Sequence, residues 1–494
     1  MPAYYLEALT VTLGIILLMI EAFGPEHSKR FRGLFAASGL AIILVFGFFA
    51  IGPDDAREGA KWVDWPIWEN FYAFDDTARF YKAFALVCTI LVILMAIDYR
   101  SVLAQFTDNP ESEAGTGEYF ALPVFACAGM MWMASAKDLV GAFVALELVT
   151  VTFYVLVAYT RRKVGSLEAG VKYLILGALS TGFLVYGIAW VYGMTGTMSF
   201  EQIASDAPTM GRSFGLLFGI GLVLVGLAFK IGAVPMQMWI PDVYQGAPTP
   251  TTAFLSVGSK AAGFVLLIRF LEPFMQAEAL KGHILGLLLI MAVATLLFGN
   301  LAALGQTNFK RLLAYSSIAN AGFILLALAA WSEPASATDP GSKGTVGFYL
   351  ATYLVMTLAA FFILGQVRIA RDSEDIDAFD GLGKRSPQLA GMMTVIMASL
   401  VGIPLTAGFV GKFFVFSVAV RQGLWWGVGV AFIGAAAGFY YYFKVIRAMW
   451  WDDGPSDAPA IELPQISRIS VYALTGAILL LGVWPQPILW VMGG

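Results

Sequence analysis

The hydrophobic pattern of the chain consists of long apolar runs separated by short polar stretches. An α-helix needs about 20 apolar residues to cross the hydrocarbon core of a membrane, and runs of suitable length predict about fourteen membrane-spanning segments. Their approximate limits are residues 3–23, 34–51, 77–97, 118–134, 139–160, 168–192, 214–239, 251–271, 284–304, 312–331, 345–367, 387–420, 424–449 and 469–492. We therefore expect an all-α polytopic membrane protein with both termini on one side of the membrane.

Two of these segments carry signs of interruption. The run at 387–420, about 34 residues long, exceeds one straight crossing, and its middle, GIPLTAGFVGK, contains Pro404 and several glycines. Segment seven contains Pro235, which removes a backbone donor and interrupts a helix. An interrupted membrane helix is tolerated only where the freed backbone groups face protein or water. We predict that helices seven and twelve are broken.

The order of lysine and proline is reversed between the two broken segments. Lys230 precedes Pro235 in segment seven, whereas Pro404 precedes Lys412 in segment twelve. Such a reversal along oppositely directed helices is what an inverted-topology repeat predicts, here of segments 4–8 onto segments 9–13, five helices each. The predicted organisation is an N-terminal three-helix segment at 1–117, a first repeat at 118–271, a second, inverted repeat at 282–450 and a C-terminal helix at 451–494.

Composition excludes several classes of function. The 494 residues are 59% hydrophobic and 13% charged, against about 25% charged for soluble domains. The mean hydropathy of +0.75 leaves no room for a large soluble domain, and the net charge of −4 gives no support for nucleic-acid binding. Cys88 and Cys127 lack the spacing of a zinc or iron–sulfur site. Phosphate-loop, dinucleotide-binding and nucleophile-elbow motifs are also missing, so we expect no metal, nucleotide or redox cofactor in this chain.

The distribution of lysine and arginine predicts the orientation of the chain. More of these residues fall in loops after odd-numbered segments than in loops after even-numbered segments. This count assigns Lys82, Arg269 and Lys310 to loops. Because basic residues are enriched in cytoplasmic loops, both termini are predicted to lie outside the cytoplasm. Three tryptophans of the long second loop would form an aromatic anchor at the outer interface: Trp62, Trp65 and Trp68.

Three lysines fall deep inside apolar segments: Lys230, Lys260 and Lys412. A charge near the bilayer centre costs between about 2.5 and 17 kcal/mol, so the default interpretation is functional. The lysines could form static ion pairs, or they could be protonatable groups along a water-filled axis. Two ammonium ions about 7 Å apart repel by ~2.4 kcal/mol at an effective dielectric of about 20, so a proton arriving at one can expel a proton from the next. Lysine suits this role because arginine stays protonated.

Two further charged residues need an explanation. Glu147 lies in the middle of a segment, within VALELVTV. It could be a neutral acid hydrogen-bonded to a neighbouring helix, or the counter-ion of Lys230, because an unpaired ion in a low dielectric is too costly to keep. Lys172 lies near the cytoplasmic end of segment six, where a lysine can simply extend its ammonium to the membrane surface.

Six motifs carry a resemblance to a known family. They are ALELVTV, SLEAGVKYLILGALSTG, FKIGAVPMQMWIPDVYQGAPTP, GSKAAGF, NFKRLLAYSSIANAGF and GIPLTAGFVGKFFVF. Over nearly its whole length the chain resembles the N-subunit family of respiratory complex I, the proton-translocating NADH:quinone oxidoreductase. The resemblance implies fourteen helices, two inverted antiporter-like repeats of five helices, and broken helices seven and twelve.

The resemblance also implies roles and partners. Glu147 and Lys230 would act as a coupled pair, Lys260 as the central relay and Lys412 as the terminal lysine of the second half, while Lys172 would lie on the proton-entry or inter-subunit side. Other membrane subunits, including antiporter-like paralogues, and the lipid bilayer would be the partners. NADH, FMN, iron–sulfur clusters and quinone would be held by other subunits. The expected location is the bacterial inner membrane, with both termini in the periplasm.

The chain departs from related antiporter-like subunits at two positions. Gln237 and Asn320 stand where histidine is common among those relatives, which favours subunit N over its larger paralogues and leaves the relay to lysines and water. Two other functions stay open on the sequence. One is a subunit of an Mrp-type cation/proton antiporter, and the other is a scaffold that only holds pumping neighbours.

Overall fold

A computed structural model describes residues 4–24, 29–49, 71–107, 116–334, 340–454 and 460–492. These described residues form helices and loops without a β-strand, apart from three isolated β-bridges. The expected aromatic anchor at Trp62, Trp65 and Trp68 lies outside the described residues.

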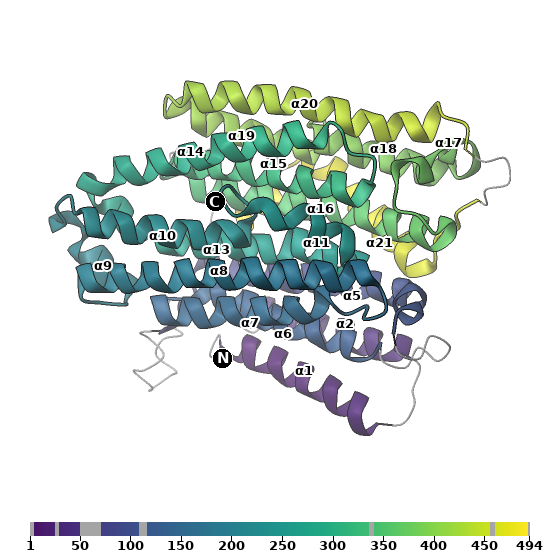
Figure 1. Ribbon diagram of the computed structural model, residues 1–494, viewed down its shortest axis with the longest axis horizontal. Helices are drawn as coiled ribbons and strands as arrows, with labels where there is room; N and C mark the ends of the chain where they lie inside the picture. Colours follow the sequence, from purple (N-terminus) through teal and green to yellow (C-terminus); the bar gives the residue numbers. More distant parts are fainter. Residues whose placement is uncertain are drawn as a thin grey trace. The chain divides into compact units, whose positions relative to one another are not determined.

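The longer helices follow one another along the chain (Figure 1). They are α1 (Tyr5–Phe23), α2 (Lys29–Phe49), α5 (Asp76–Gln105), α6 (Glu118–Ser135), α7 (Leu139–Val157), α8 (Val164–Thr195), α10 (Phe214–Ile231), α13 (Lys260–Leu271), α14 (Glu278–Ala303), α15 (Phe309–Ala329), α16 (Gly341–Arg371), α18 (Pro387–Val401), α19 (Ala407–Arg421), α20 (Trp425–Trp450) and α21 (Gln465–Val483). The short ones are α9 (Phe200–Asp206), α11 (Ile240–Gly246), α12 (Thr249–Phe254), α17 (Leu382–Arg385) and α22 (Gln486–Val491).

The prediction of an all-α polytopic membrane protein is confirmed. Within the described ranges, 12 helices are long and apolar enough to cross a membrane. The other two expected segments correspond to α6, with 18 residues, and to the pair α18 and α19, with 15 residues each.

The chain forms two compact units, and the first contains Met1–Ile231 and Gly258–Ile284. In this unit α8 packs along α10, α6 packs against α1, α5 and α7, and α5 packs against α2. The helices α6, α7, α8 and α10 lie side by side (Figure 1).

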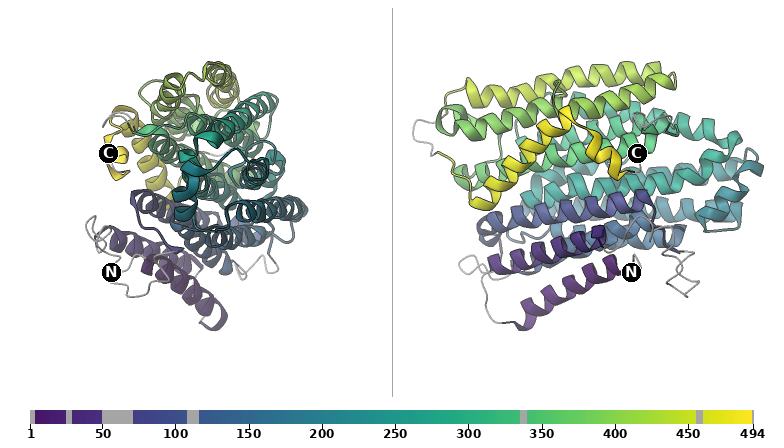
Figure 2. Two further views of the ribbon diagram at one scale, coloured as in Figure 1. Left: turned by 90° about the vertical axis from the view of Figure 1, so that its left-hand side faces the viewer. Right: turned by 180° about the vertical axis from the view of Figure 1, so that it is seen from behind.

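The second unit contains Gly232–Val257 and Leu285–Gly494. Its centre is α16, which contacts α12, α15, α18, α19 and α21 and, like α15, is buried along almost its whole length. The short α22 turns away from the end of α21 and packs on α16 (Figure 2, right). The predicted division into inverted repeats stays a prediction.

Both predicted helix breaks are present. Helix α10 ends at Ile231, and Gly232 follows in the left-handed region with φ 75°. Helix α18 ends at Val401, and Gly402 follows with φ 94°. A third irregularity was not predicted, a π-helical turn, Leu255–Ser259, directly before α13. Such turns are frequent at functional sites.

Replacing Gly402 with alanine should destabilise the break in helix twelve. The left-handed backbone costs a residue with a Cβ about 1–2 kcal/mol, and the new Cβ would lie 3.1 Å from Cδ of Lys412. Gly391→Ala is the matched control, because that glycine lies inside α18 with open space around it and alanine favours a helix by about 1 kcal/mol. The thermal unfolding temperature of the purified protein should therefore be lower for Gly402→Ala and equal or higher for Gly391→Ala. An equal change in both would contradict the assigned break.

The loop between α16 and α17 should respond to pH. Burial raises the pKa of the Asp380 carboxyl to about 6, helped by the charges of Asp377 and Asp452 and opposed by Arg371. Because an unfolded aspartate has a pKa of about 3.9, the charged form of Asp380 disfavours the folded loop above pH 6. That penalty is relieved as the pH falls from 6 towards 4.

We therefore expect the amides of residues 376–385 to be better protected from hydrogen exchange at pH 5 than at pH 7, after correction for the intrinsic rates. Asp380→Asn should protect the loop equally at both pH values. A pH difference that survives this substitution would show that another group is responsible.

Candidate functional site

Lys230 lies in the last turn of α10, directly before the first helix break, and is 4% exposed. Its Nζ donates a hydrogen bond of 3.0 Å to Oγ1 of Thr150 on α7. The ring of Phe153, from the same helix, has its centroid 5.8 Å from Nζ. A cation is favoured at the C-terminal end of a helix, where backbone carbonyls lack partners. Lys230 thus lies at the interrupted end of α10, while its ammonium group is held by Thr150 of α7.

Glu147 belongs to the same cluster and is half-buried on α7, three residues before Thr150. Its Oε1 accepts a hydrogen bond of 2.9 Å from Oγ1 of Thr181 on α8. The structure records no ion pair within 4 Å between Glu147 and Lys230 in the part of the chain that it describes, although the carboxylate interacts with the ammonium group through its charge. The expected partners therefore lie near each other, and each is bound directly to a threonine.

Lys260 is the first residue of α13, next to the π-helical turn, and is 2% exposed. Helix α13 packs against α10 in the first unit. The two helices lie close together at Gly263, where an added Cβ would lie 3.2 Å from Cγ of Lys230. Lys230 and Lys260 thus come from adjoining helices of one unit.

Lys412 lies in the second turn of α19 and is 8% exposed. Its Nζ donates to the carbonyl oxygens of Leu400, at 2.9 Å, and Val401, at 2.7 Å. These carbonyls belong to the last turn of α18, where no intrahelical donor reaches them. The ring centroid of Phe323 lies 5.1 Å from Nζ. As for Lys230, the ammonium group lies at the C-terminal end of an interrupted helix.

Lys172 differs from the three buried lysines. Its side chain is 42% exposed on α8 and pairs with Glu168 at 2.7 Å. Such exposed pairs, four residues apart on a helix, stabilise by only about 0.3–0.5 kcal/mol. The structure therefore places Lys172 on an accessible face, and its role at an entrance or a subunit contact stays a prediction.

Asn320 lies in a buried network of hydroxyl and amide groups. The hydroxyl of Tyr349 donates to Oδ1 of Asn320 at 2.7 Å, and Nδ2 of Asn320 donates to the carbonyl of Ser316 at 2.8 Å. The hydroxyl of Ser316 in turn contacts that of Tyr442. These buried groups form a continuous polar chain across α16, α15 and α20 in the second unit.

Two buried ion pairs were missed because their lysines were assigned to loops. The first joins α5 and α1, where Nζ of Lys82 lies 2.6 Å from Oε1 of Glu7 and both side chains are buried. The hydroxyl of Tyr72 donates to Oε2 of Glu7 at 3.0 Å and also contacts Lys82. The signal was the position of Lys82, which falls inside the apolar run that begins at residue 77.

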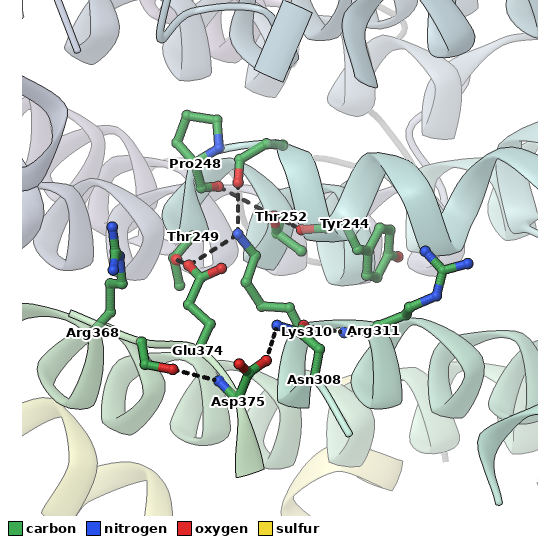
Figure 3. A network of polar contacts seen from close by, with 12 residues as sticks. Tyr244, Pro248, Thr249, Thr252, Asn308, Lys310, Arg311, Arg368, Glu374 and Asp375 are labelled. Atoms are coloured by element: carbon green, nitrogen blue, oxygen red, sulfur yellow. Dashed lines mark hydrogen bonds and ion pairs between the residues drawn. The ribbon is translucent and has the colours of Figure 1, made fainter. Parts of the chain in front are cut away.

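The second missed pair holds the connector between α11 and α12 (Figure 3). Lys310, fully buried at the start of α15, lies 3.2 Å from Glu374 and donates to the carbonyl of Ala247 at 2.7 Å. Thr249 of α12 donates to the same carboxylate at 3.0 Å. Beside it Arg311 pairs with Asp242 at 2.7 Å. The WIPDVYQGAPTP motif is thus fixed to α15 by two cations.

Comparisons with known proteins decide the family. A family model described as "NADH:quinone oxidoreductase/Mrp antiporter, TM" matches residues 136–438. NADH-quinone oxidoreductase subunit N of Heliobacterium modesticaldum is 40% identical over 485 residues, which cover 98% of this chain and 96% of the relative. The chain belongs to the subunit N family of NADH-quinone oxidoreductase. The subunit N of Desulfitobacterium hafniense is 37% identical over 98% of this chain and 95% of the relative.

Solved structures agree with membership of the subunit N family. A chain of respiratory complex I from Thermus thermophilus with bound aureothin is 31% identical, with a TM-score of 0.77, and the match covers 99% of this chain and 100% of the other. A chain of an archaeal membrane-bound sulfane sulfur reductase is 26% identical with a TM-score of 0.85, covering 99% and 96%. This subunit is therefore an antiporter-like multi-pass membrane protein, and the resemblance seen in its motifs is confirmed.

Proposed function

We propose that this subunit moves protons through a relay of Glu147, Lys230, Lys260 and Lys412, driven by redox chemistry in other subunits of NADH:quinone oxidoreductase. One observation carries the proposal. All three lysines are buried at places where a helix is irregular, namely the end of α10, the π-helical turn before α13 and the end of α18. Lys172 would act at the entry or inter-subunit side, consistent with its exposure.

The chemistry of these positions suits reversible protonation. A neutral lysine amine gains a proton to become an ammonium ion, which the carbonyl dipoles at a helix end stabilise. A proton gained by a neighbouring lysine raises the electrostatic energy of that ammonium ion and drives the release of its proton. Lys230 binds a threonine hydroxyl and Lys412 binds only carbonyls among its recorded hydrogen bonds. A carboxylate at this distance would oppose loss of the proton, whereas these uncharged acceptors leave proton loss possible.

The partners and the location of this subunit are proposed from its relatives. Their names and the complexes that contain the similar chains support other membrane subunits of complex I, including antiporter-like paralogues, as partners. NADH, FMN, iron–sulfur clusters and quinone would be bound by those other subunits. The proposed location is the bacterial inner membrane with both termini in the periplasm.

Lys260→Met and Lys412→Met test the proposal, since each removes the charge and nearly preserves the size of the side chain. In proteoliposomes containing the assembled complex, both variants should lose most proton translocation and slow quinone reduction. Lys444→Met is the matched control, because Nζ of Lys444 also donates to a carbonyl, that of Gln306 at 2.9 Å, outside the proposed relay. Normal pumping by the first two variants would instead support a scaffold.

A second function, in an Mrp-type cation/proton antiporter, is favoured by the comparisons. The description of the matching family model also includes the Mrp antiporter, and a chain of the Mrp complex of Dietzia sp. DQ12-45-1b shares the fold, with a TM-score of 0.81 and 19% identity. Isolation of the subunit with its native partners separates the two functions. Recovery with flavin and iron–sulfur subunits supports complex I, and recovery with cation-antiporter subunits alone supports the second function.

A further inference from the structure

A cavity of about 540 Å³ lies in the second unit, beside the start of α18 and the first turns of α21. Its polar lining includes Arg385, Gln388, Glu462, Arg468 and Tyr472. The volume falls within the range of about 300–1,000 Å³ usual for small-molecule sites. None of these residues belongs to the proposed relay.

The polar side of the cavity has an excess of positive charge. Arg385 from α17 and Arg468 from α21 both line it, with Glu462 as the one carboxylate in the lining. The charge of Arg385 also acts against Arg371 at the end of α16, a repulsion that Asp380 opposes. Two nitrogen atoms of Arg371, Nε and Nη2, are buried without a hydrogen-bond partner among the described residues. Of these arginines, Arg385 lines the cavity together with Arg468, and an anion there would supply a counter-charge to both.

The backbone at the cavity also favours an anion. Pro387, Gln388 and Leu389, the first residues of α18, line it. The preceding residue, Ser386, makes no side-chain cap to α18, because its hydroxyl interacts instead with the backbone of Ile461. Pro387 has no backbone N–H, so Gln388 and Leu389 supply the N–H groups at this helix end. Such groups carry partial positive charge and bind phosphate groups well.

The lining of the cavity is also partly apolar. Leu389, Met392 and Ile461 line it. On α21 the neighbouring large side chains are exposed, Ile469 to 62% and Tyr472 to 47%. A ligand with a compact anionic head and an apolar tail fits such a surface. By the distribution of basic residues, the loops that form the cavity are predicted to be cytoplasmic.

We propose that this cavity binds the phosphate headgroup of an anionic phospholipid. The planar guanidinium groups of Arg385 and Arg468 match phosphate oxygens in bidentate geometry, and basic pockets at the ends of membrane helices bind such headgroups. The bound headgroup would fix the N-terminal end of α18, whose opposite end supplies the carbonyls that hold Lys412. That consequence for transport rests on the proposed function, whereas the lipid site does not.

Photoactivatable phosphatidylglycerol and phosphatidylcholine, each incorporated into nanodiscs with the intact complex, test the site directly. We expect phosphatidylglycerol to cross-link to peptides that contain Arg385 or residues 460–472, and unlabelled phosphatidylglycerol to compete. Phosphatidylcholine should label these peptides at least about tenfold less, which corresponds to about 1.4 kcal/mol. Equal labelling by the two lipids, or no labelling of these peptides, would overturn the proposal.

A double variant that removes both cavity arginines, and a control variant beside it, test whether positive charge binds the headgroup. Arg385→Gln/Arg468→Gln should lower the phosphatidylglycerol labelling at least about tenfold, since each substitution removes a charge-assisted hydrogen bond to the phosphate. Lys384→Gln is the matched control, because this neighbouring side chain is 69% exposed, pairs with Asp453 and does not line the cavity. Unchanged labelling in the double variant would count against the site. Competition by glycerol phosphate as strong as by the lipid would identify a soluble anion as the ligand and overturn the lipid assignment.

The labelling and pumping experiments together distinguish failure of the lipid site from failure of the proposed proton relay. Loss of labelling in the double variant with normal pumping would keep the lipid site and refute its effect on α18. Loss of pumping in Lys412→Met with normal labelling would support the relay and leave the lipid site unchanged.

Discussion

Replacing Lys230 with methionine is expected to leave the complex assembled while lowering quinone reduction and proton pumping at least tenfold, about 1.4 kcal/mol in the rate-limiting barrier. Methionine has nearly the same length and shape as the lysine side chain and removes only the protonatable group. Thr150 then loses its ammonium partner, and Glu147 loses the positive charge with which it interacts. Both losses can be measured in one sample of proteoliposomes, proton pumping as NADH-driven acidification and quinone reduction as NADH oxidation.

The control is again Lys444→Met, which should retain both activities. Glu147→Ala should reproduce the defect of Lys230→Met, because the two residues are proposed to act as one pair. If assembled complexes with Lys230→Met pumped normally, Lys230 would have no place in the relay.

Removing one member of the Glu7–Lys82 pair should have the largest effect on stability. Lys82→Met leaves the Glu7 carboxylate buried beside Tyr72 without its cation. Breaking a buried pair in this way destabilises by about 3–5 kcal/mol, whereas replacing both partners with uncharged groups is often nearly neutral. Denaturant unfolding in detergent should therefore show a large loss for Lys82→Met and recovery in Glu7→Gln/Lys82→Met.

The decisive comparison is between the stability of Glu7→Gln/Lys82→Met and that of Lys82→Met. A double variant as unstable as the single one would mean that the lysine packs or hydrogen-bonds in a way that the carboxylate does not explain. The exposed pair of Lys172 and Glu168 offers a reference, since Lys172→Met should change stability by no more than about 0.5 kcal/mol.

The helix breaks could be predicted because their cause is local. Pro235 and Pro404 cannot continue a helix, and the neighbouring glycines take up the left-handed backbone. The π-helical turn at Leu255–Ser259 has no such signal in its sequence, LSVGS, because one extra residue in a turn is stabilised by the surrounding helices.

The buried lysines could also be predicted, although their direct partners could not. Charge balance suggested that Glu147 would pair with Lys230, yet Thr150 and Thr181 take the direct hydrogen bonds. A sequence does not show which of several polar groups a neighbouring helix brings within 3 Å. Lys82 and Lys310 were assigned to loops because a cation near the start of an apolar run looks solvated until the packing is known. In the structure α5 and α15 begin before these lysines.

Substituting arginine for Lys230 tests most directly whether this residue exchanges its proton, because arginine keeps the charge but does not release it under physiological conditions. The quantity to measure is the number of protons translocated per NADH oxidised by the assembled complex in proteoliposomes. A ratio well below that of the wild type in Lys230→Arg is the predicted result. A wild-type ratio would show that a fixed positive charge suffices and would contradict the proposed relay.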